Sequence, residues 1–112
     1  MGTNKLKMAD IVPSMLSAAR DSLKKDWPTV KDFAEPEVKR LAQSLIDITR
    51  LTIAGKINQQ QAAGLLQIHR NSAMTVLLTI EGLGLIAVQN ALNSAMSAVR
   101  TVVNTALGFR LL

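Results

Sequence analysis

The chain has 112 residues, no cysteine and a formal net charge of +5. This length is enough for one domain, so we expect a single domain over residues 1–112. The lack of cysteine excludes disulfides, thiolate nucleophiles and thiolate metal sites, and it favours a cytoplasmic location. The N-terminal residues include Asp10 and Pro13 in place of an apolar segment, so we do not expect a cleavable export signal.

The charges lie mainly in the first part of the chain. Through residue 70 there are 11 basic and 7 acidic side chains, and between residues 21 and 40 the two kinds alternate. Alternation of this type indicates a solvated helix face with local ion pairs. Few aromatic side chains are present for stacking on bases, which argues against nucleic-acid binding. They are Trp27, Phe33 and Phe109.

Helix signals dominate the N-terminal half. We expect a flexible segment over residues 1–13 and helices over residues 14–54. Ser14 can cap the first helix, and Pro28 marks its end or a bend. Pro36 suits the first turn of a second helix that runs to residue 54. The apolar side chains of these helices recur at spacings of three and four, as in Met15, Ala19 and Leu23, and in Val38, Leu41, Leu45 and Ile48.

A turn between two helices follows at residues 55–61. Gly55 is placed to end the second helix in a left-handed conformation. Asn58 and Gln61 have the spacing of a capping box, in which each side chain accepts a hydrogen bond from the other residue's backbone N–H. We therefore predict a helical hairpin at this point.

The third helix is predicted to be very long. No proline interrupts residues 58–107, and the apolar pattern continues up to Gly108. At ~1.5 Å per residue, such a helix reaches about 75 Å, which is longer than a compact domain of this size. An alternative is a bend at Gly82 and Gly84 that folds the last segment back into a four-helix bundle.

The later part of this helix has heptad spacing on its apolar side and a polar side almost without charge. We therefore expect it to form the interface of a homo-oligomer, because the N-terminal helices are too short to cover its whole length. The predicted interface consists of Val88, Ala91, Leu92, Ala95, Val99, Val102, Ala106 and Phe109.

Glu81 is the one charged residue between residues 71 and 99. A carboxylate in an apolar stretch is costly unless it is paired, hydrated or protonated, so Glu81 is a candidate buried or pore carboxylate. The other interpretation is an exposed polar strip shared with Thr75, Thr79 and Asn90. Residues 73–91 also have nearly the length of a membrane span, although Glu81 and two glycines argue against insertion.

Catalytic patterns are weak in this sequence. His69 has no carboxylate three or four residues away, so it lacks the partner found in bundle metal sites. Gly82, Gly84 and Ala87 match the spacing of a dinucleotide-binding loop, but no acidic residue follows about 20 positions later. We predict no catalytic, cofactor or metal residues and infer no small-molecule substrate.

These patterns together predict an all-α, oligomeric protein. The expected function is non-enzymatic assembly into a homo-oligomer or filament, or a scaffold for partner helices. The alternative is a small membrane-associated protein that inserts residues 73–91, with Glu81 facing water in an oligomeric pore. A basic protein associated with nucleic acid is the weakest interpretation.

Overall fold

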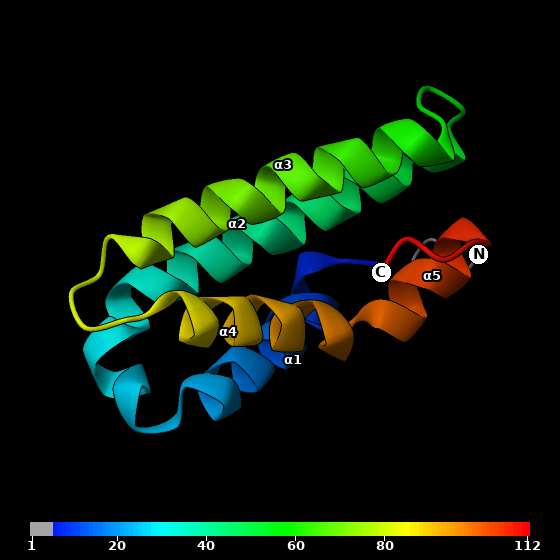
Figure 1. Ribbon diagram of the computed structural model, residues 1–112. Helices are drawn as coiled ribbons and strands as arrows, with labels where there is room; N and C mark the ends of the chain where they lie inside the picture. The colour runs from blue at the N-terminus through cyan, green and yellow to red at the C-terminus, as the bar shows by residue number, and fades with distance from the viewer. Residues whose placement is uncertain (1–5) are drawn as a thin grey trace.

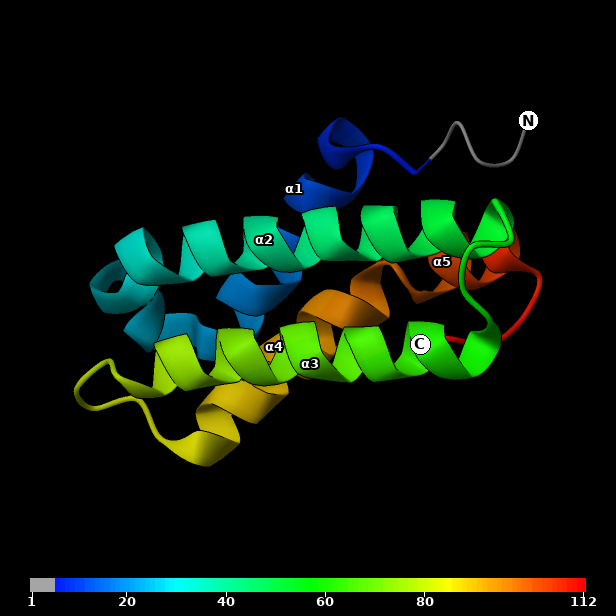
Figure 2. The same ribbon diagram turned by 90° about the horizontal axis from the view of Figure 1, so that it is seen from above.

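The computed structural model describes residues 6–112, and this part of the chain is helical without strands. The hairpin of α2 and α3 forms one layer, and α1 and α4 cross it in a second layer (Figures 1 and 2). The predicted all-α class is therefore confirmed. The elements are α1 (Met8–Leu23), the short 3₁₀ helix η2 (Lys24–Asp26), α2 (Trp27–Ile53), α3 (Gln59–Leu78), α4 (Leu85–Ala98) and α5 (Arg100–Leu107).

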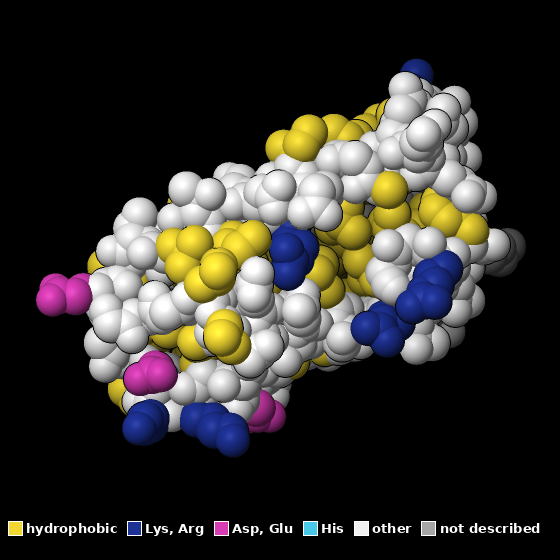
Figure 3. Space-filling view, viewed as in Figure 1, with side chains coloured by type: hydrophobic (Ala, Val, Ile, Leu, Met, Phe, Trp, Pro, Cys, Tyr) yellow, Lys and Arg dark blue, Asp and Glu magenta, His cyan; other side chains and the backbone are white. Residues whose placement is uncertain are grey.

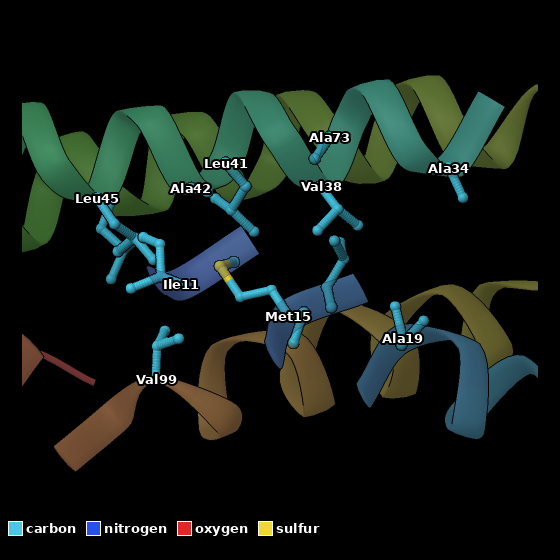
Figure 4. Packing of buried hydrophobic residues seen from close by; sticks show 14 of the residues in the cluster. Ile11, Met15, Ala19, Ala34, Val38, Leu41, Ala42, Leu45, Ala73 and Val99 are labelled. Atoms are coloured by element: carbon cyan, nitrogen blue, oxygen red, sulfur yellow. The ribbon is translucent and has the colours of Figure 1, made fainter. Parts of the chain in front are cut away.

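The core lies between the two layers. Apolar residues spaced three or four apart on each helix face inward, as expected for amphipathic helices. Met15 of α1 is fully buried and points toward α2, where Leu41 and Ala42 are also buried (Figure 4). Burial of each large side chain contributes roughly 1.5–3 kcal/mol, so this shared core accounts for the association of the two layers.

The first helix begins at Met8, six residues before the predicted cap at Ser14. The flexible segment predicted over residues 1–13 is therefore wrong for residues 8–13, and its first five residues lie outside the described part. Pro13 lies inside α1, where it removes one backbone hydrogen bond. Ile11 is only 1% exposed, and its packing in the core offsets that loss.

The second helix also begins earlier than predicted. Pro28 lies in the first turn of α2, and the helix continues through Pro36 in place of starting there. The buried face extends on both sides of Pro36, with Ala34 before it and Val38 after it, each 1% exposed. Packing of this face outweighs the cost of about 3 kcal/mol that proline imposes inside a helix.

The turn between α2 and α3 has the predicted geometry. Gly55 has a φ of 74°, in the left-handed region. Asn58 Oδ1 accepts a hydrogen bond from the backbone N–H of Gln61 at 2.8 Å, and Gln61 Oε1 accepts one from the backbone N–H of Asn58 at 2.9 Å. The capping box is confirmed.

The very long helix over residues 58–107 is wrong. The chain leaves the helix after Leu78, turns with Gly82 at a φ of 86°, and starts α4 at Leu85. A second break at Val99 separates α4 from α5. The structure has the alternative arrangement, in which α4 folds back against α1, because this arrangement buries the apolar face of α4 inside the chain.

The same turn interrupts the predicted membrane segment at residues 73–91. Within residues 6–112, none of the helices combines the length and the apolar character needed to cross a membrane.

Candidate functional site

The residues predicted as an oligomer interface form part of the core of a single chain. Val88, Ala91, Leu92, Ala95 and Val99 are at most 3% exposed, and Val102, Ala106 and Phe109 are half-buried. The heptad spacing identified a buried face, but its partners are helices of the same chain: α4 packs on α1 and α5 packs on α2. An interface between copies through these residues would require α4 to leave the bundle.

Glu81 is exposed in the turn between α3 and α4, so within one chain it is not a buried carboxylate. Thr75, Thr79 and Asn90 are exposed as well, as the polar-strip interpretation expects. His69 lies exposed on α3. In residues 6–112, no three histidine or acidic side chains gather in a way that would hold a metal ion.

The turn between α3 and α4 carries exposed apolar side chains. Ile86 is 72% exposed and Leu85 is 51% exposed at the start of α4. Val76 and Leu78, at the end of α3, are 37% and 40% exposed. Figure 3 shows apolar side chains gathered over this junction. We call Leu78, Leu85 and Ile86 the α3–α4 apolar patch, because Val76 is about 160° from Leu78 around the α3 axis and lies on the other side of this helix.

A cleft of about 500 Å³ opens at the other end of α3, between this helix and the start of α5. Its apolar floor is visible as a hollow in Figure 3. The walls come from α3, α4, α5 and the C-terminal residues, which converge here because α4 runs back along the bundle. The lining residues are Ala63, Leu66, Gln67, Arg70, Asn93, Met96, Ser97, Arg100, Leu111 and Leu112.

Two arginines line this cleft, and both are held by neutral oxygen atoms. Arg70 Nη2 donates a hydrogen bond to Asn93 Oδ1 at 2.9 Å, which joins α3 to α4. Arg100 Nη2 donates to Ser97 Oγ at 3.0 Å. The ion pairs of the described residues involve other arginines, Arg20 and Arg40. The two guanidinium groups at the cleft therefore have no carboxylate partner within residues 6–112.

The C-terminal residues are folded back to form one wall of the cleft. Gly108 ends α5 with a φ of 79°, which reverses the chain. Asn104 Oδ1 then accepts hydrogen bonds from the backbone N–H groups of Leu111 and Leu112, at 2.9 and 3.0 Å. One asparagine thus positions two apolar side chains on the cleft.

A second pocket of about 410 Å³ lies between the C-terminal part of α2 and the residues before α1. Its wall includes Thr49, which is 2% exposed and whose Oγ1 has no hydrogen-bond partner among the described residues. Lys7 and Arg50 also line it. A buried hydroxyl without a hydrogen-bond partner raises the free energy of the folded state, so Thr49 destabilises the core locally.

Sequence reasoning missed the cleft, because its two arginines are 30 positions apart and meet only through the reversal at Gly82. The distribution of charge in the sequence was one available signal for a basic cleft. Residues 48–112 contain five Lys and Arg but a single acidic residue, Glu81, so a charged side chain that lines a cleft within this segment is usually basic.

Comparison with known proteins finds no family model, no curated protein and no solved structure that matches this chain.

Proposed function

We propose that the protein is a non-enzymatic assembly module that self-associates through the α3–α4 apolar patch. The observation that carries the proposal is the exposure of Ile86, which is 72% accessible beside the 51% exposed Leu85. Contiguous exposed apolar surface commonly marks an interaction site. The patch replaces the predicted interface on α4, whose residues are already covered by α1.

The distribution of charge supports a second copy of the chain as the partner. Each chain has a net charge of +5, so two copies repel each other wherever their basic surfaces meet. In a symmetric dimer the same surface is used twice and must complement itself. Residues 71–99 contain no Lys or Arg, so contact through the patch keeps the basic surfaces of the two copies apart.

The test is the molar mass of the purified chain by size-exclusion chromatography with light scattering, without detergent and over a range of concentrations. We expect a concentration-dependent dimer or higher oligomer. Ile86→Lys should return the protein to a monomer, because it places a charge in the patch of each copy. Ile68→Lys is the matched control, since Ile68 is a 63% exposed isoleucine on α3 outside the patch.

A monomer for the unmodified chain at concentrations of several hundred micromolar would refute the proposal. Equal loss of association in the Ile86→Lys and Ile68→Lys variants would place the interface elsewhere than the patch.

A further inference from the structure

The cleft between α3 and α5 has the size of a small-molecule site and an amphipathic lining. Its volume of about 500 Å³ lies within the range of ~300–1,000 Å³ that is usual for ligand pockets. Such pockets combine mostly apolar walls with a few convergent polar groups. Here the apolar part comes from Leu66, Met96 and the C-terminal leucines, and the polar part comes from both arginines with Asn93 and Ser97.

The polar part is suited to an anion. A guanidinium group has five N–H donors, and Arg70 and Arg100 each donate one of them to a neutral side-chain oxygen. The remaining donors are available to a ligand. A carboxylate matches the planar, forked arrangement of these donors and accepts two hydrogen bonds from one guanidinium.

No acidic side chain competes for these donors within the described lining of the cleft. On the face seen in Figure 3, the acidic side chains gather at the opposite end of the molecule, while Lys and Arg side chains border the hollow. A cationic ligand would therefore be repelled by the two guanidinium groups, and an anion would be attracted to them.

The apolar floor of the cleft also restricts which ligand can fit. A small hydrophilic anion would leave the part-exposed Met96 and Leu111 uncovered, whereas a hydrocarbon alone would leave the arginine donors unused. A ligand with a carboxylate at one end and a single hydrocarbon chain satisfies both parts of the cleft.

We infer that this cleft binds an amphipathic monocarboxylate of the medium-chain fatty-acid class, with its carboxylate on Arg70 and Arg100 and its hydrocarbon chain on the apolar floor. The site is independent of the proposed self-association, because none of the residues that line it belongs to the α3–α4 apolar patch. Asn104 supports the site by holding Leu111 and Leu112 on its wall.

The test uses decanoate below its micelle-forming concentration, titrated by calorimetry and by NMR of protein with ¹³C-labelled methionine methyl groups. Met96 lines the cleft, while Met15 is fully buried in the core and serves as the internal reference. We expect saturable binding that shifts the Met96 methyl signal and leaves the Met15 signal unchanged. Decanol, which has the same hydrocarbon chain without the charge, should bind at least ~10-fold more weakly, given the strength of hydrogen bonds to charged groups.

The double variant Arg70→Gln/Arg100→Gln should weaken decanoate binding by ~10-fold or more while leaving decanol binding unchanged. The control Lys25→Gln/Lys39→Gln removes the same formal charge at exposed positions outside the cleft and should bind decanoate normally. A second variant, Ala63→Phe, keeps both arginines and fills part of the floor from an exposed position on α3, so it should weaken both ligands.

Circular dichroism of each variant separates loss of the ligand from loss of the fold. Equal affinity for decanoate and decanol, or equal decanoate binding by the two double variants, would overturn the inference. A shift confined to methionines outside the cleft would overturn it as well. None of these results depends on whether the protein self-associates, since all titrations can be repeated on the Ile86→Lys variant.

Discussion

The guanidinium of Arg70 donates a hydrogen bond to Asn93 Oδ1 across 23 residues of sequence. Among the side-chain hydrogen bonds of residues 6–112, it is the one that connects the α2–α3 layer with α4. Because the pair is exposed, water competes with it. We expect a coupling free energy of ~0.5–1 kcal/mol between Arg70→Met and Asn93→Ala, measured by a double-mutant cycle in urea. A coupling near zero would mean that the two side chains do not hold each other in solution.

The chain reversal at Gly82 leads to a prediction about the free energy of unfolding. Gly82 has a φ of 86°, where a side chain is strained even though nearby space is open. Gly82→Ala should lower the free energy of unfolding by about 1–2 kcal/mol, the usual cost of the left-handed conformation for a residue with a Cβ. Gly84→Ala is the control, because Gly84 has a φ of −82° and equally open surroundings. Urea denaturation should show a larger loss of unfolding free energy for Gly82→Ala than for Gly84→Ala, which changes only the N-cap residue of α4.

The capping box at the start of α3 can be measured in the same way. Asn58→Ala removes the acceptor for the Gln61 N–H and should cost ~1 kcal/mol of unfolding free energy. Gln60→Ala, at an exposed position in the same turn of the helix, should change stability by less than about 0.5 kcal/mol. Equal effects would show that the cap contributes nothing specific.

The buried hydroxyl of Thr49 is expected to destabilise the native state. Thr49→Val keeps the shape of the side chain and removes a polar group that has no partner in the described structure, so unfolding free energy should rise by ~1 kcal/mol. Thr52→Val is the matched control, because Thr52 Oγ1 donates to the carbonyl of Ile48 at 2.7 Å and that bond would be lost. The denaturation midpoint of Thr49→Val should increase, while that of Thr52→Val should not.

The folded-back position of α4 predicts an asymmetry between two leucines of this helix. Leu92 is 1% exposed, so Leu92→Ala should lower the free energy of unfolding by about 2–5 kcal/mol. Leu85 is 51% exposed, and Leu85→Ala at low protein concentration should cost less than about 1 kcal/mol. Similar small losses for both variants would contradict the packing of α4 on α1.

The sequence predicts local structure correctly where residues close together in the chain determine it. The capping box of Asn58 and Gln61 needs only two side chains and the backbone between them, so its prediction was confirmed. Pro36 was misinterpreted as the start of a helix, because its cost inside α2 is offset by core contacts with residues far away in sequence.

The same limit applies to the candidate sites. The apolar face of α4 follows from its periodicity, but the pattern is the same whether α1 or another chain covers it. The cleft depends on contacts between distant parts of the chain. Arg70 and Arg100 line the same cleft because the chain reverses at Gly82, and the cleft is completed by C-terminal residues that fold back on Asn104. Tertiary geometry of this kind has no signature within a short window of sequence.

The contact between α1 and α4 has a consequence for the order of folding during synthesis. The ribosome releases α1 early, yet this helix makes its most extensive contacts with α4, more than 60 residues later. Until residues 85–98 emerge, part of the apolar face formed by Ile11, Met15 and Ala19 has no final partner. A nascent chain that stalls before that point presents this face to chaperones and to other unfinished chains.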